Sequence, residues 1–177
     1  MPESAPKSAG HGYDYIVLDG QRLDLERHPT DFLVDAGSAI PSSPALTGSW
    51  MVARGLMRVR TASPGETDGL MEQARAHGFA RHVYVNAKTG EEMLIGDRIV
   101  LELVEDDPAR LSEISREFHL AHETRMGAAH ILRLGPATGM NPLEAANRIA
   151  DLPGVRSCHP EILVEQQYHA PQRPAPR

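Results

Sequence analysis

Histidine and cysteine are the residues of this chain whose side chains could do chemistry near neutral pH. The chain contains nine histidines and one cysteine. His119 and His122 are three residues apart, and His159 follows Cys158 directly. The patterns that hold zinc in many proteins, such as CxxC or HExxH, do not occur in the sequence. We therefore expect solvated or hydrogen-bonded histidines, and neither a metal nor a cofactor.

Nucleophilic catalysis needs a serine or cysteine on a sharp turn, beside a base that a third group orients. The sequence has no GxSxG motif, and a lone cysteine such as Cys158 is most often a small core residue. The loop LGPATGMNP matches neither the dinucleotide-binding nor the P-loop pattern. The acidic residues Glu102, Glu105, Asp106 and Asp107 are expected at a strand end and a helix N-terminus, where negative charge is favoured. The sequence therefore predicts a protein that is not an enzyme.

Composition excludes several classes of partner. The chain has 177 residues, a formal net charge of −6 and only 5% aromatic residues. An acidic chain with few aromatic residues argues against nucleic-acid binding. No apolar run approaches the length that crosses a membrane, and the N-terminus MPESAPKSAGHGYDY lacks the apolar core of a signal peptide. We expect no membrane association and a cytoplasmic location.

The second half of the chain predicts a strand–helix–strand–strand–helix–strand order over residues 97–169. Asp107-Pro108 and Asn141-Pro142 each combine an N-cap residue with proline at the first helical position. The apolar residues recur at strand spacing before the first helix and at helical spacing within both helices. We predict one core in which the helices pack on the strands, made of Leu111, Ile114, Phe118, Leu143 and Ile149 against Ile99, Leu101, Leu132 and Leu134.

The first half, residues 13–96, is expected to be rich in strands. Asp19-Gly20 is a hairpin-turn dipeptide between two apolar runs. The Pro- and Ser-containing segment 37–49 is expected to be irregular, and a short helix is predicted from Pro64 to His77. This half repeats the later order weakly, which predicts a degenerate second copy that has lost its first helix. Residues 1–12 are expected to be disordered, and residues 170–177 form a Pro-rich tail.

The order of elements and the closing motif resemble the inhibitory pro-region of subtilisin-like serine proteases. Three segments carry the resemblance, namely RIVLELVEDDPARLSEISREFHL, NPLEAANRIADLPGVRSCHPEILVE and, more weakly, YIVLDGQRLDLERHPTDFLV. The second is the most specific, because it matches a helix, a Pro-Gly-Val turn and a final strand. The good match covers residues 98–168, and no catalytic motif of the protease occurs in the chain.

This resemblance implies an α+β fold, a ferredoxin-like βαββαβ antiparallel sheet with two helices on one face. It also implies an inhibitor and folding chaperone that docks its sheet on a subtilisin-like protease, encoded separately or originally fused to this chain. An acidic residue of the final strand, matched here by Glu161, would cap helices of the protease. The C-terminal segment would lie extended in the substrate cleft, with the binding residues Val164, Glu165, Gln166, Gln167, Tyr168 and His169.

A second function is compatible with the same sequence. A small-ligand-binding regulatory domain of ferredoxin-like plan would have the same order of elements, because fold alone does not fix function. The extended segment after the last predicted strand favours the inhibitor, since a regulatory domain does not need it.

Overall fold

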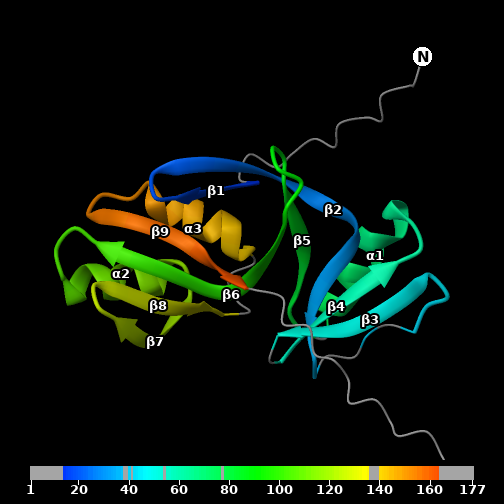
Figure 1. Ribbon diagram of the computed structural model, residues 1–177. Coiled ribbons are helices and arrows are strands. Elements are labelled where there is room, and N and C mark those ends of the chain that lie inside the picture. Colours follow the sequence, from blue (N-terminus) through cyan, green and yellow to red (C-terminus); the bar gives the residue numbers. More distant parts are fainter. Residues whose placement is uncertain are drawn as a thin grey trace, which may run out of the picture. The chain divides into compact units, whose positions relative to one another are not determined.

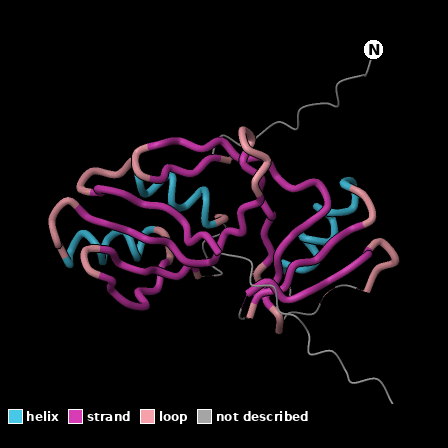
Figure 2. The backbone as a smooth tube through the Cα atoms, viewed as in Figure 1, coloured by secondary structure: helices cyan, strands magenta, loops and turns pink. Residues whose placement is uncertain are grey.

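The computed structural model describes residues 14–37, 40, 42–53, 55–76, 78–135 and 140–163. Of these described residues, 52% lie in strands and 22% in helices. Figures 1 and 2 show the elements along the chain. In chain order the elements are β1 Tyr15–Leu18, β2 Gln21–Asp35, β3 Leu46–Ala53, β4 Leu56–Thr61, α1 Pro64–Arg75, β5 Ala80–Asn86, β6 Glu92–Leu103, α2 Pro108–Glu117, β7 Leu120–Met126, β8 Ala129–Leu134, α3 Pro142–Ala150 and β9 Val155–Leu163. None of these helices is long and apolar enough to cross a membrane.

The predicted ferredoxin-like fold, with four strands and two helices, is wrong. The strands pair as one nine-stranded sheet in the order β3-β4-β2-β5-β6-β8-β7, with β1 on β2 and β9 on β6. The predicted degenerate copy stays a prediction: β2, β3, β4, α1 and β5 follow the order of β6, β7, β8, α3 and β9 without a counterpart of α2.

The sheet has more strands than predicted because β2 and β6 are long enough to pair with different neighbours along their lengths. The first four residues of β2, Gln21–Asp24, pair with β1, and Asp31–Asp35 pair with β4. In β6, Glu92 and Met93 pair with β5, whereas Arg98–Glu102 pair with β8. Backbone groups that would be unpaired at a sheet edge are thereby hydrogen-bonded.

The described residues form two compact units. The first unit contains residues 14–27 and 84–162, and the second contains residues 28–83. Residues 14–27 belong to the first unit although they precede the predicted boundary at residue 97. In the first unit β6 lies between β9 and β8, and β7 pairs with β8.

The local signals for helices and turns correspond to real elements. Asp107 accepts a hydrogen bond from the N–H of Ala109 at 2.9 Å, and Asn141 accepts one from Glu144 at 2.7 Å, so both predicted caps are present. The proline after each cap is the first residue of its helix. Asp19 and Gly20 have φ values of 50° and 75°, the left-handed backbone that a two-residue hairpin turn requires.

The core of the first unit contains most of the predicted residues. Ile99, Leu101 and Leu132 of the sheet are fully buried with Ile114 and Ile149 of the helices, and Phe118 and Leu134 join them. Leu143 is an exception, because it packs with Ile16, Leu25, Tyr84 and Ile95 in a separate cluster. Asn147 of α3 also donates a hydrogen bond to the carbonyl of Tyr15 at 2.8 Å. Helix α3 is therefore held partly by β1, which the sequence did not predict.

The second unit combines an apolar core with a buried ion cluster. Helix α1 packs Leu70, Met71 and Ala74 against residues of the sheet that include Phe32 and Val59. Asp31 is fully buried and accepts hydrogen bonds from Arg58 Nε at 2.6 Å and from Arg60 Nε and Nη2 at 2.9 and 2.8 Å. The ring of Trp50 lies 5.5 Å from the Arg58 guanidinium and 5.1 Å from that of Arg60.

The two arginines determine the charge state of Asp31. Burial raises the pKa of this carboxyl, but the hydrogen bonds from Arg60 and Arg58 outweigh burial and leave the pKa lowered to about 2. Asp31 is therefore ionised at neutral pH, and its negative charge is what makes burial of the Arg58 side chain tolerable.

Candidate protein-binding face

One of the predicted binding residues lies in the described part of the chain. Glu161 is on β9, whose buried residues Cys158 and Pro160 face the core. Because side chains alternate along a strand, Glu161 points to the opposite face of the sheet. The other predicted binding residues, Val164, Glu165, Gln166, Gln167, Tyr168 and His169, lie outside the described residues.

Glu161 lies directly over Gly96 of β6. A Cβ atom at Gly96 would be 2.5 Å from Glu161 Oε2 and 3.2 Å from Glu161 Cβ, so any other residue there would force the Glu161 side chain to shift. The carboxylate is 3.5 Å from Arg98 Nη1, and the Glu161 side chain is 30% exposed. A partner can therefore reach the carboxylate while Arg98 and the close contact with Gly96 restrict its position.

Two arginines on neighbouring strands share a carboxylate on the same face. Arg98 pairs with Arg133 across β6 and β8, and Glu123 binds both, at 2.6 Å from Arg98 Nε and 2.5 Å from Arg133 Nε. The β7–β8 register shifts between His122 and Thr124, and this bulge directs the Glu123 side chain toward the arginines. The hydrogen bond to Glu123 raises the pKa of Arg98. Asp97 Oδ2 also lies 3.7 Å from Arg133 Nε.

Apolar side chains continue this face beside the charges. Val100 pairs with Ile131, and Met126 pairs with Ala129. Met126 is 68% exposed, and Val104, which follows the end of β6, is 55% exposed. These are the two most exposed of the large hydrophobic residues in the described chain. We call this surface the open sheet face and define it by Arg98, Val100, Glu123, Met126, Ala129, Ile131, Arg133 and Glu161.

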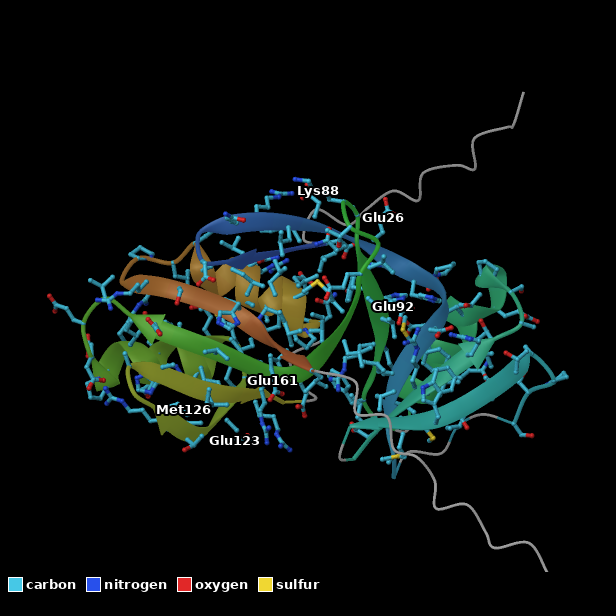
Figure 3. All side chains as sticks on the ribbon, in the orientation of Figure 1. Glu26, Lys88, Glu92, Glu123, Met126 and Glu161 are labelled. Atoms are coloured by element: carbon cyan, nitrogen blue, oxygen red, sulfur yellow. The ribbon has the colours of Figure 1, made fainter. Side chains whose placement is uncertain are left out.

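Both helices of the second half pack against the other face. Ile99, Leu101 and Leu132 alternate with the residues of the open sheet face and are buried against α2 and α3. In the view of Figure 1, α2 and α3 lie behind β9, β6 and β8. Glu161, Glu123 and Met126 are labelled in Figure 3. Neither α2 nor α3 covers the open sheet face, which carries both charged and apolar side chains.

The cysteine and the histidine combinations that were considered for catalysis or metal binding lie in surroundings that do not favour those roles. Cys158 is buried in the core of the first unit, and burial raises the pKa of its thiol, which disfavours the reactive thiolate. His119 follows α2 with a φ of 52°, whereas His122 is on β7, so the two do not share a helix face. His159 Nδ1 lies 3.1 Å from the carbonyl of Pro160.

A pair of histidines that the sequence did not predict meets across β7 and β8. His122 Nε2 is 3.3 Å from His130 Nδ1, and His130 Nε2 is 3.7 Å from Asp106 Oδ1. The seven residues between the histidines include a β-bulge and a turn, so the pairing depends on strand register rather than on a local motif. In the described residues no group of three or more His, Cys, Asp or Glu side chains is placed to hold a metal ion.

The chain was also compared with known proteins. No protein-family model, curated protein or solved structure matches it.

Proposed function

We propose that this protein inhibits a subtilisin-like serine protease and assists its folding. The observation that carries the proposal is the open sheet face, which combines exposed apolar side chains with a positioned acidic residue in the first unit. The sequence resemblance over residues 98–168 supports a subtilisin-like protease as the partner. The nine-stranded sheet departs from the compact pro-region that the resemblance implied, but α2 and α3 both pack on the face of the sheet opposite to this one.

The apolar part of the open sheet face supplies binding energy in this proposal. Burying a side chain such as Met126 against a partner contributes about 1.5–3 kcal/mol. Val100, Ala129 and Ile131 extend the apolar strip across β6 and β8. In the pro-regions that the sequence resembles, this face of the sheet packs on surface helices of the protease. The partner surface is therefore expected to be helical and apolar at its centre.

In this proposal, Glu161 determines the orientation in which the partner protein binds. A helix N-terminus carries unpaired backbone N–H groups and partial positive charge, so it binds a carboxylate. Glu161 is partly exposed and restricted by Gly96 and Arg98, which lowers the entropy it loses on binding. Glu161 therefore fits the role of an acid that caps the N-terminus of a partner helix.

The full-length chain should be assayed against a panel of purified subtilisin-like proteases, with the inhibition constant as the measurement. Met126→Asp places a charge in the apolar strip and should weaken inhibition at least tenfold, as expected for an interface anchor. Met51→Asp is the matched control, because Met51 is 38% exposed on β3 of the second unit. Circular dichroism of both variants checks that they remain folded.

The two variants give outcomes that can be separated. Equal loss of inhibition in Met126→Asp and Met51→Asp would remove the open sheet face from the mechanism. Failure of the wild-type chain to inhibit any protease of the panel at micromolar excess, or to speed the refolding of its catalytic domain, would reject the proposed function itself.

The segment after β9 is tested separately. Removal of residues 165–177 begins beyond the last residue of β9, Leu163, so the melting temperature should be nearly unchanged. If Tyr168 fills the pocket nearest the catalytic nucleophile, the truncated protein should bind the protease more than tenfold more weakly. Unchanged affinity would show that inhibition does not use this segment.

A further inference from the structure

His122 and His130 form a contact with the chemistry of a metal-binding pair. Their facing nitrogens, Nε2 of His122 and Nδ1 of His130, are 3.3 Å apart. The ring centroids are 5.5 Å apart, so the two nitrogens point toward each other across a shared N–H···N hydrogen bond. His130 is buried, whereas His122 is exposed, so the pair opens to solvent on the His122 side.

Asp106 favours Nδ1 as the nitrogen of His130 that is free to act as a ligand. Its Oδ1 atom lies 3.7 Å from His130 Nε2, on the side of the ring away from His122. A carboxylate at this position favours a proton on Nε2 and a lone pair on Nδ1. Asp106 is itself held by Arg125, whose Nη1 lies 2.7 Å from Oδ2.

The spacing of the two nitrogens matches that of two ligands of one metal ion. Zinc–nitrogen bonds of about 2.0–2.1 Å at a tetrahedral angle place the two nitrogens about 3.3 Å apart. Binding would replace the shared hydrogen bond and needs the rings to tilt, which the exposed His122 side chain can do. The proton on His122 Nε2 would move through solvent to Nδ1, so that Nε2 can present its lone pair to the ion.

We propose that His122 Nε2 and His130 Nδ1 bind a divalent transition-metal ion such as Zn²⁺, with Asp106 orienting His130. Imidazole is a preferred ligand of zinc, copper and nickel. The protein supplies two ligands, so water or a ligand from another molecule completes the coordination. The positive charge of Arg125 opposes the ion and limits its affinity, whereas Asp106 offsets that charge. The site is built on the β7–β8 hairpin and does not depend on the proposed protease inhibition.

The test is a titration of the metal-free full-length chain with Zn²⁺. Calorimetry and ¹⁵N NMR of the histidine rings monitor the titration. We expect zinc-dependent shifts at Nε2 of His122 and at Nδ1 of His130, a pattern that no other histidine should reproduce. His122→Ala should weaken zinc binding at this site at least tenfold. Asp106→Asn keeps the shape of the side chain and should weaken it about tenfold, as expected for a residue that orients a ligand.

His119→Asn is the matched control. His119 is an exposed histidine three residues from His122, and asparagine tolerates its positive φ. This variant should bind zinc like the wild-type chain. The proposal is overturned if zinc affinity is the same in His122→Ala as in wild type, if the ring shifts occur at Nε2 of His130 instead of Nδ1, or if millimolar Zn²⁺ leaves both rings unchanged.

Discussion

Two clusters, each with one carboxylate between two arginines, lie in different units and differ in burial. In the second unit fully buried Asp31 binds Arg58 and Arg60. In the first unit Glu123, with a side chain 26% exposed, binds Arg98 and Arg133. The distances are alike, but the surroundings differ.

The difference in burial decides what each cluster contributes. Charges in a protein interior interact strongly and cannot be solvated if a partner is lost, so the Asp31 cluster is a determinant of stability. Charges near water are screened and contribute little to folding, so the Glu123 cluster remains available to an approaching surface. A carboxylate between two arginines therefore stabilises the second unit, whereas in the first unit the same arrangement stays near the solvent, where the proposed function would use it for binding.

The largest expected effect is that of Asp31→Asn. This substitution keeps the side-chain shape but removes the charge that compensates buried Arg58, which should destabilise the second unit by about 3–5 kcal/mol. Trp50 is the one tryptophan of the chain and contacts this cluster, so its fluorescence during urea unfolding reports the change. A free energy of unfolding within 1 kcal/mol of wild type, on the order of a surface pair, would show that the cluster is not a determinant of stability.

A double substitution sharpens this comparison. Asp31→Leu combined with Arg58→Met removes both buried charges and should recover much of the lost stability, because apolar replacements of buried ion pairs are often neutral. If the double variant is as unstable as Asp31→Asn, the loss comes from packing or from Arg60 rather than from the uncompensated charge of Arg58.

The next effect in size is a dependence of stability on acidic pH. The folded pKa of Asp31 is about 2, below its ordinary value of 3.8, so the folded state binds this proton less readily than the unfolded state. The resulting stabilisation of about 2 kcal/mol should be fully present above pH 3.8 and be lost as the pH falls toward 2. Unfolding free energies between pH 2 and 5, followed by Trp50 fluorescence, should show this slope in wild type and a smaller one in Asp31→Asn.

Two glycines should respond in opposite directions. Gly69, inside α1, has open space where a Cβ atom would lie, so Gly69→Ala should stabilise the protein by about 0.5–1 kcal/mol. Gly96→Ala should instead displace the Glu161 side chain from its place beside Arg98. The melting temperatures of the Gly69→Ala and Gly96→Ala variants measure both effects on stability. Equal stabilisation by the two substitutions would contradict the close packing of Glu161 on β6.

The smallest effect on stability is expected from Glu123→Gln. Loss of an exposed pairing with Arg98 and Arg133 should cost about 0.2–1 kcal/mol, and high salt should reduce the difference. Thermal melting of wild type and variant at low and high salt measures it. A salt-independent loss as large as that of Asp31→Asn would mean that the open sheet face is a structural core rather than a binding surface.

Local signals in the sequence predicted the elements that close within a few residues. The caps Asp107 and Asn141 bind backbone N–H groups two and three residues away, and the Asp19-Gly20 turn joins adjacent strands. Strand β3, in contrast, starts at Leu46 inside a segment predicted to be irregular. Its prolines and small residues argue for a loop, but pairing with β4 supplies hydrogen bonds that local composition does not encode.

The sequence by itself determined the order of elements from residue 98 onward, their caps and most of the core between α2, α3 and the sheet, because these follow from spacings of two to four residues. Only the tertiary structure decided that the sheet has nine strands, that Asp31 meets Arg58, and that His122 meets His130. The physical reason is that backbone hydrogen-bonding groups are the same in every strand. Which strands pair, and in which register, depends on how separated segments bury their apolar faces together.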